Sequence, residues 1–194
     1  MINLMYVVLM ALLALNVPSD VLNGFSLIND SLLHSTANST GENNDVYKDF
    51  AEYMKQNPEK VKAWYTKAME GGSVPACYRL GVIYQEGRAG QKDPALAETY
   101  YKRCSEVRYT KAMVRLADMY LKGEGVPVRT KAAVKLFSDA ANEGNTDAMF
   151  RLGELSLTGE GMAKSTANAK KWFQKASYRG HEGAKEALSK PPFA

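Results

Sequence analysis

Residue patterns that would support catalysis are missing from this 194-residue sequence. A serine enzyme of the Ser-x-x-Lys type needs that spacing because one helical turn then brings the lysine to the nucleophile. This pattern does not occur, and neither does a Gly-x-Ser-x-Gly elbow. The only histidines, His34 and His181, are isolated, and a lone histidine is more often inert than a metal ligand. The residues therefore predict no enzyme, no metal site and no cofactor.

Other chemically suggestive residues recur 36 positions apart. Gly123-Glu124-Gly125 returns as Gly159-Glu160-Gly161, which is typical of glycines that end helices rather than of a phosphate-binding loop. Asp118 and Glu154 have the same separation and are expected to face solvent. The separation of 36 residues indicates that a repeated structural unit positions all of these residues.

A 36-residue repeat runs through most of the chain. Such a period is the sequence signature of stacked helix pairs. The columns that recur in register are apolar or glycine: Ala76, Ala112, Ala148 and Ala184; Leu80, Leu116, Leu152 and Leu188; Gly87, Gly123 and Gly159; Ala97, Ala133 and Ala169; Tyr65, Tyr101, Phe137 and Phe173.

Each repeat is expected to form two helices. Apolar or small residues three and four positions apart give the first helix one buried face, and Gly87 then ends it with a positive backbone angle. The second helix is predicted over about 94–106, with Asp93 as its N-cap and Pro94 at its first position. Its small residues, together with Gly81, are expected to let the two helices approach closely.

The sequence thus predicts an all-α fold: an α/α solenoid of about four 36-residue helix-turn-helix repeats with a C-terminal capping helix. The predicted organisation is a signal peptide or N-terminal anchor at 1–19, a polar linker at 20–44, the solenoid at 45–190 and a tail at 191–194. Within the solenoid we expect a degenerate unit at 45–73, full units at 74–109, 110–145 and 146–181, and the cap at 182–190.

The N-terminus carries an apolar segment, Leu4–Leu15, without a charged side chain. A membrane span needs about 20 apolar residues, so this shorter segment is more typical of a secretory signal. No basic residue precedes it and Val17-Pro18-Ser19 is a poor cleavage site, so an uncleaved anchor and a buried apolar helix stand as alternatives. The expected location is periplasmic or secreted.

Charge is unevenly distributed along the chain, whose formal net charge is +4. Residues 1–45 hold four acids and no Lys or Arg, so all 25 bases lie in 46–194 beside 17 acids. A basic body favours acidic partners, but bases scattered among acids are more typical of a solvated surface. The sequence predicts a monomer with a protein or peptide partner, no nucleic acid, and no membrane contact beyond a possible N-terminal anchor.

The repeat units resemble the Sel1-like repeat. In the second unit the resemblance is carried by Ala112, Leu116, Tyr120, Gly123, Gly125, Val126, Lys131 and Ala132. It covers roughly 45–188, with departures from the family pattern at Ala117, Ser156 and Gln91. The resemblance implies an α/α solenoid that binds other proteins, often in bacterial export, envelope signalling or host contact.

The same resemblance bears on the two cysteines. A cysteine-rich branch of the family has one Cys in the first helix and one near the end of the second, and Cys77 and Cys104 match those places. It implies a disulfide between them, which antiparallel helix pairing would permit and an oxidising compartment would require. The alternative is two buried free thiols. A redox centre is not expected, because there is no Cys-x-x-Cys motif.

A partner site is expected on the concave face, which first helices line in such solenoids. The positions not needed for the core form an apolar stripe with acids: Tyr78, Val82, Val114, Asp118, Leu121, Phe150, Glu154 and Leu157. An arginine column runs beside it, at Arg79, Arg115 and Arg151, and would suit a carboxylate-rich peptide. Packing between repeats is the alternative for both sets, and for the arginines it is favoured.

These features favour an exported, non-enzymatic repeat scaffold or adaptor that binds a protein or peptide on its concave face. The first alternative is an immunity or inhibitor protein against an envelope-targeted toxin. A cell-wall or β-lactam hydrolase is less favoured, because the chain offers no residues for that chemistry.

Overall fold

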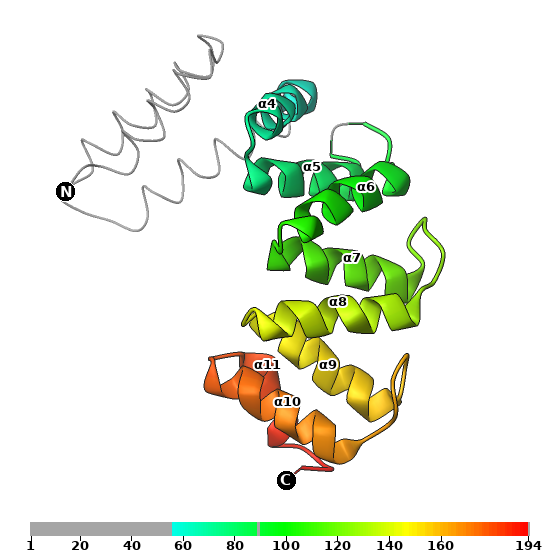
Figure 1. Ribbon diagram of the computed structural model, residues 1–194, viewed down its shortest axis with the longest axis vertical. Coiled ribbons are helices and arrows are strands. Elements are labelled where there is room, and N and C mark those ends of the chain that lie inside the picture. The colour runs from blue at the N-terminus through cyan, green and yellow to red at the C-terminus, as the bar shows by residue number, and fades with distance from the viewer. Residues whose placement is uncertain (1–55, 89, 194) are drawn as a thin grey trace, which may run out of the picture. The chain divides into compact units, whose positions relative to one another are not determined.

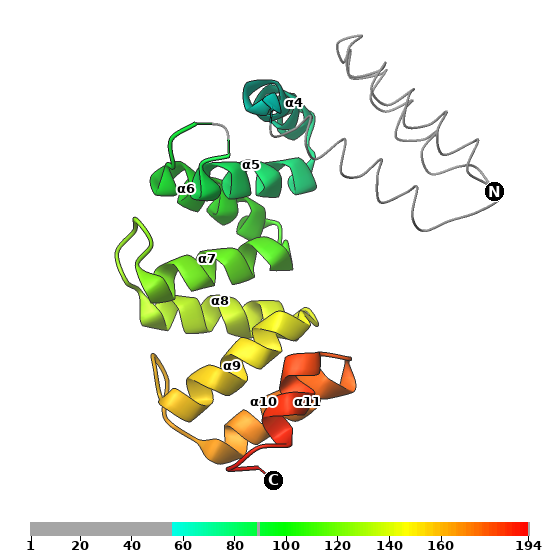
Figure 2. The same cartoon turned by 180° about the vertical axis from the view of Figure 1, so that it is seen from behind.

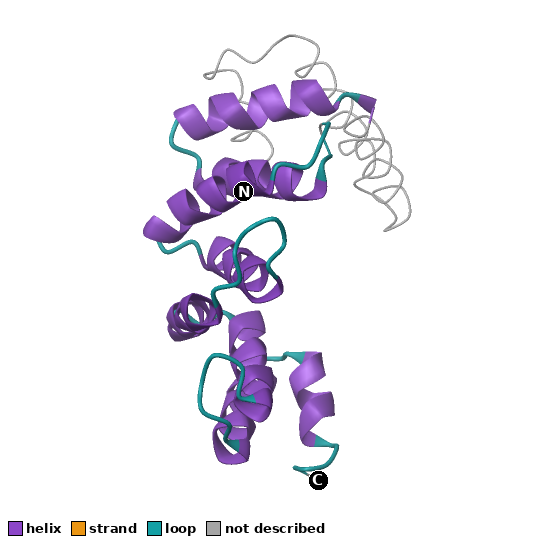
Figure 3. Cartoon of the chain, turned by 90° about the vertical axis from the view of Figure 1, so that its right-hand side faces the viewer, coloured by secondary structure: helices purple, strands orange, loops and turns teal. Residues whose placement is uncertain are grey.

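The computed structural model describes residues 56–88 and 90–193, and every regular element in these ranges is an α-helix (Figure 3). This confirms the predicted all-α fold class. The helices are α4 (Pro58–Glu70), α5 (Val74–Glu86), α6 (Pro94–Glu106), α7 (Thr110–Lys122), α8 (Thr130–Asn142), α9 (Thr146–Thr158), α10 (Thr166–Tyr178) and α11 (Glu182–Leu188). The predicted signal segment, the linker, His34 and the start of the degenerate unit lie outside the described residues.

The chain divides into two compact units. One contains α4, which starts with Pro58 at its first turn and buries Val61. The other contains residues 77–87 and 91–193 of the described chain, and therefore nearly all of α5 and every later helix. The candidate site lies in this second unit.

Within the second unit the helices repeat the 36-residue spacing. The first helices α5, α7 and α9 begin at Val74, Thr110 and Thr146, and the second helices α6, α8 and α10 begin at Pro94, Thr130 and Thr166. Figures 1 and 2 show the pairs following one another in chain order, with α11 against α10 at the C-terminal end. Consecutive pairs are joined by packing of α6 on α7 and of α8 on α9.

The helix ends follow the predicted backbone chemistry. Gly87, Gly123 and Gly159 have φ angles of 72°, 67° and 82°, in the left-handed region that glycine adopts without strain. The Asp93 side chain accepts a hydrogen bond of 2.9 Å from the backbone N–H of Leu96, which caps the start of α6. Each first helix therefore stops at the place where the chain must turn into its partner.

Each second helix buries one aromatic ring in the core, and in two helix pairs that ring packs against a glycine of the first helix. The fully buried rings are Tyr101, Phe137 and Phe173. A Cβ at Gly81 would lie 2.5 Å from Cε1 of Tyr101, and one at Gly153 would lie 2.6 Å from Cδ1 of Phe173. Real Cβ atoms do not approach carbon this closely, so the predicted close approach of paired helices is confirmed.

The C-terminal residues complete the last pair. His181 caps α11, its Nδ1 accepting a 3.2 Å hydrogen bond from the backbone N–H of Ala184. The Phe193 ring packs edge-on against Phe173, with ring centroids 5.7 Å apart. No helix among the described residues combines the length and apolar character that a membrane crossing requires.

Candidate functional site

Three residues of one repeat column, Tyr78, Val114 and Phe150, lie half-buried on successive first helices. The Tyr78 ring lies 5.5 Å from that of Tyr109 and 5.9 Å from that of Tyr101. Phe150 stacks on His181 with centroids 4.5 Å apart and lies 5.5 Å from Phe173. Part of each ring therefore packs between helices, and the remainder is accessible.

Two leucines extend this stripe by two helical turns. Leu121 and Leu157 are half-buried at equivalent positions near the ends of α7 and α9. Val82, which the sequence also assigned to the stripe, is only 6% exposed and belongs to the core. That assignment is corrected, because a side chain without accessible surface cannot meet a partner. We call the remaining residues the first-helix face: Tyr78, Val114, Asp118, Leu121, Phe150, Glu154 and Leu157.

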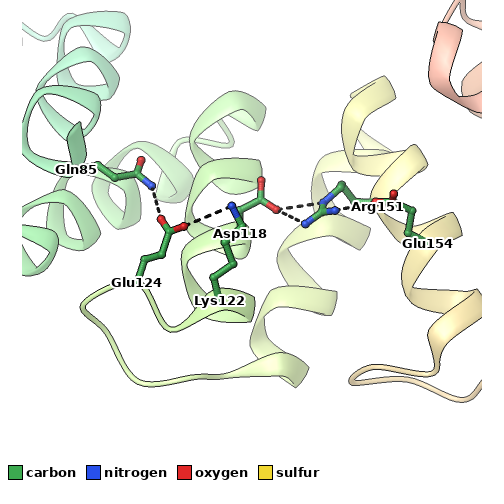
Figure 4. A network of polar contacts seen from close by, with 6 residues as sticks. All are labelled: Gln85, Asp118, Lys122, Glu124, Arg151 and Glu154. Carbon is green, nitrogen blue, oxygen red and sulfur yellow. Dashed lines mark hydrogen bonds and ion pairs between the residues drawn. The ribbon is translucent and has the colours of Figure 1, made fainter.

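The arginine column joins neighbouring repeats. The Arg151 Nη2 and Nε donate to Asp118 Oδ1 at 2.7 and 3.1 Å, and its Nη1 donates to Glu154 Oε2 at 2.7 Å (Figure 4). Burial lowers the pKa of Arg151, but the bonds to Glu154 and Asp118 outweigh it and hold that pKa above its ordinary value. Asp118 and Glu154 are thus paired rather than simply solvent-facing.

Arg115 has a different partner. Its guanidinium lies near Tyr78 on α5; burial lowers the pKa of Arg115, and the interaction with Tyr78 and nearby charges raises it above the ordinary value overall. Arg151 therefore connects α9 to α7 through its hydrogen bonds to Asp118, and Arg115 lies beside a residue of the previous first helix. Arg79, the remaining member of the column, is exposed.

A second series of polar contacts links α6, the end of α5 and the loop that follows α7. The buried Tyr101 hydroxyl donates to Gln85 Oε1 at 2.8 Å, and Gln85 Nε2 donates to Glu124 Oε2 at 3.2 Å. Lys122 approaches the same carboxylate at 3.4 Å (Figure 4). Burial raises the pKa of Tyr101, so its phenol remains a donor. These bonds fix the end of α5 against the loop that follows α7.

The two cysteines meet between α5 and α6. Both are buried free thiols, and Cys77 Sγ donates to the backbone carbonyl oxygen of Tyr100 at 3.4 Å. Burial, followed by a side-chain hydrogen bond with Cys77, raises the pKa of Cys104. Buried thiols with a raised pKa are poor nucleophiles. The disulfide between them stays a prediction.

One further polar cluster, which the repeat pattern did not predict, is centred on Glu98 of α6. Its Oε1 accepts from the Tyr120 hydroxyl at 2.7 Å, from Lys102 Nζ at 2.8 Å and from Arg129 Nη1 at 3.0 Å. Burial raises the pKa of Glu98, but hydrogen bonds from Lys102 and Tyr120 lower it below the ordinary range overall. A departure from the repeat could have revealed this cluster. The positions 36 residues after Glu98, Tyr120 and Arg129 hold Val134, Ser156 and Ser165, which cannot form the same ionic contacts.

His181, the described histidine, has structural partners at both ring nitrogens. His181 Nε2 lies 3.4 Å from Asp147 Oδ1 while its other ring nitrogen caps α11. The part of the chain that the structure describes contains no group of three His, Cys, Asp or Glu side chains arranged to hold a metal ion.

The site that this geometry offers is a surface of apolar side chains on helices that ion pairs hold together. The fold and this surface define the class: a helical repeat scaffold.

Comparisons with known proteins agree with this class. Residues 74–106, 110–145 and 146–181 match the Sel1 repeat family. These stretches make up more than half of the chain, which therefore belongs to the Sel1 repeat family, as the sequence resemblance predicted. Residues 20–70 match the GldM N-terminal domain, and the structure describes the last part of this segment, including α4. The comparison with curated proteins gave no match.

Solved structures show the same repeat fold. One is c5321, a protective antigen present in uropathogenic Escherichia coli strains that displays an SLR fold; it is 31% identical, with a TM-score of 0.62 over 65% of this chain and 27% of its own. A Sel1 repeat protein from Oxalobacter formigenes is 28% identical, with a TM-score of 0.58 over 64% of this chain and 94% of its own. Cysteine rich protein B of Helicobacter pylori is 25% identical, with a TM-score of 0.55 over 69% and 96%.

Proposed function

We propose that this Sel1-repeat protein is an exported, non-enzymatic scaffold that binds a protein or peptide on its first-helix face. One observation carries the proposal: half-buried apolar side chains that keep some accessible surface recur in register on successive first helices, at Tyr78, Val114 and Phe150 and again at Leu121 and Leu157. Apolar side chains that remain accessible in register are a feature of interaction sites. The salt bridges of Arg151 to Asp118 and Glu154 hold α7 and α9 in place, which lowers the entropy lost on binding.

The leucines are the best positions for a test. Tyr78 and Phe150 also pack against other rings, so their loss would disturb folding and binding together. A photo-crosslinking amino acid at Leu121, introduced into the full chain in its native host, would identify the bound protein. The purified partner would then be titrated against wild type and against the Leu121→Glu/Leu157→Glu double variant.

The expected result is a loss of affinity of at least about tenfold for the double variant, because two charges would be placed in an apolar contact. The matched control is Val107→Glu/Val128→Glu, the same kind of change at two exposed apolar residues outside the face. It is expected to bind as wild type does. Equal affinity for both double variants, or no crosslink from Leu121, would contradict the proposal.

The lack of enzymatic activity is part of the proposal. It is supported by the pairing of Asp118 and Glu154 with Arg151, which leaves neither carboxylate placed as a free general base. A chromogenic β-lactam and purified peptidoglycan, incubated with the purified chain, test the hydrolase alternative. Turnover above that of a heat-denatured sample would overturn this part.

Export and a Cys77–Cys104 disulfide belong together in the proposal. Supporting observations are the uncharged segment Leu4–Leu15 and the contact between the two buried side chains. A bond closing this loop would stabilise the fold by about 3–4 kcal/mol on the chain-entropy model. Protein taken from its native compartment, denatured and alkylated without reductant, is expected to remain unlabelled at both cysteines. Labelling of both would contradict the disulfide and weaken the case for export.

A further inference from the structure

The cations of α10 are not balanced by acids. Residues 161–181 contain no Asp or Glu, and their cations are Lys164, Lys170, Lys171, Lys175 and Arg179. The other second helices mix both signs: α6 contains Glu98 and Glu106, and α8 contains Asp139. The positive charge of the repeat body therefore gathers on its last second helix.

These cations lie on the solvent side of the helix. Towards the core, α10 buries Ala169, Phe173 and Ala176. On the opposite side Lys171, Lys175 and Tyr178 follow one another at i, i+4 and i+7, which places them in one line. All three are exposed, and Tyr178 is the most exposed of the large hydrophobic residues that the structure describes, at 93%. We call this line, with Lys170 and Trp172 beside it, the α10 outer face.

Its lysines are not engaged in ion pairs. In the described part of the chain, Lys164, Lys170, Lys171 and Lys175 form no salt bridge, and the Lys175 ammonium lies 4.5 Å from the centre of the Trp172 ring. Arg179, by contrast, donates to the backbone carbonyl oxygen of Gly144 at 3.2 Å. The free charges are thus lysines on flexible stems.

We propose that the α10 outer face docks the protein onto an anionic lipid bilayer. Lysine is a hydrated point charge without the fixed fork with which arginine recognises a particular carboxylate, so a row of free lysines suits a plane of mobile anionic headgroups better than one acidic peptide. Tyr and Trp rings beside lysines are the residue types that settle at the headgroup level. An exposed face of one helix also meets a flat surface without needing a groove.

The test compares two kinds of vesicles with the full chain. One is pure phosphatidylcholine and the other an equimolar mixture of phosphatidylcholine and phosphatidylglycerol, and the quantity measured is the ratio of the two partition coefficients. Because Leu4–Leu15 is uncharged, its contribution appears in both vesicles and cancels in the ratio. Wild type is expected to prefer the anionic vesicles, and about 1 M NaCl is expected to remove that preference by screening.

The decisive variant is Lys171→Glu/Lys175→Glu. Each lysine at an anionic surface strengthens binding about fivefold, so the preference is expected to fall by roughly 25-fold or more. The matched control is Lys92→Glu/Lys111→Glu, which makes the same change of net charge at two exposed lysines outside α10. The control is expected to keep most of the preference. Circular dichroism would establish that both variants are folded.

Three results would overturn the proposal. Equal partition of wild type into both vesicles would exclude an anionic-lipid surface. An equal loss of the preference in the control and the α10 variant would assign the effect to net charge. Binding of polyglutamate to wild type through Lys171 and Lys175, without binding to anionic vesicles, would make the face a site for acidic peptides.

Discussion

The first-helix face and the α10 outer face treat charge in opposite ways. On the first-helix face, Arg151 holds two carboxylates from consecutive first helices, so its charge is engaged inside the protein. On the α10 outer face, Lys171 and Lys175 have no ionic partner in the described chain and project into solvent. The first arrangement fixes helices and presents apolar surface, whereas the second leaves charge available at long range. Positive side chains in the same repeat protein can therefore have different roles: Arg151 stabilises the packing of helices, and Lys171 and Lys175 are available to a partner.

The largest effect is expected where α9 meets α10. Gly153→Ala would place a Cβ 2.6 Å from Cδ1 of the buried Phe173, so α9 must move away from α10 and carry Phe150 and Arg151 with it. We expect a loss of about 2–3 kcal/mol in the free energy of unfolding, measured by urea denaturation. The reverse change at the equivalent position, Ala117→Gly, is expected to cost only about 1 kcal/mol, the difference in helix propensity. An unchanged midpoint for Gly153→Ala would show that the face does not depend on this contact.

The next largest effect is a difference in stability between charge removal on the first-helix face and on the α10 outer face. Arg151→Gln removes the bridge between Asp118 and Glu154 and is expected to cost about 1–2 kcal/mol. Lys171→Gln makes the same charge change on the α10 outer face and is expected to alter stability by less than about 0.5 kcal/mol. Urea denaturation of both variants in one buffer is the measurement. Equal losses would break the distinction between structural and free charge.

Sequence reasoning succeeded where one physical requirement repeats. The period of 36 residues, the cap at Asp93 and the positive angle at Gly87 each follow from backbone chemistry that acts locally, and the helix bounds agree with them. The small residue at Gly81 opposite Tyr101 was also predictable, because both columns recur. Local rules applied three times in register define the fold.

The site was less predictable, because side-chain partners across repeats are not local. The arginine column was recognised, but whether Arg115 meets a phenol and Arg151 a carboxylate depends on what the previous repeat supplies at Tyr78 and Asp118. Val82 was assigned to the surface by analogy with its column and is buried. Averaging charge over 46–194 also hid the acid-free stretch that makes α10 distinct.

The paired carboxylate of Glu98 is expected to make the stability of the protein depend on pH. Its pKa is lowered in the folded protein, so it contributes stability above the carboxyl pKa of the unfolded chain, about 4.3, and that contribution is lost as the pH falls through the folded pKa. Glu98→Gln is expected to cost about 1 kcal/mol at pH 7, and this cost is expected to shrink as the pH falls from about 4.3 towards and through the folded pKa. Thermal denaturation of both proteins across this range tests the sign. A difference that grows on acidification would contradict it.

The smallest effect concerns Arg108, which stands where the later repeats have Gly144 and Gly180 and adopts their left-handed conformation at φ 59°. That conformation costs a non-glycine residue about 1 kcal/mol, so glycine should relieve it. Arg108 also pairs with Glu143 of the next repeat, an exposed ion pair worth up to about 1 kcal/mol. The two terms oppose each other, and Arg108→Gly alone is expected to change stability by only a few tenths of a kcal/mol.

Removing the pair first separates these terms. In a Glu143→Gln background the ion pair is already absent, so Arg108→Gly is expected to stabilise the protein by about 0.5–1 kcal/mol. If Arg108→Gly instead destabilises both backgrounds equally, the pair contributes nothing and the arginine stem packs across the turn. A gain that appears only without Glu143 would place Arg108 with Arg151, as a charge that joins repeats. The lysines of α10, which form no salt bridge within the described chain, would then stand apart from both arginines.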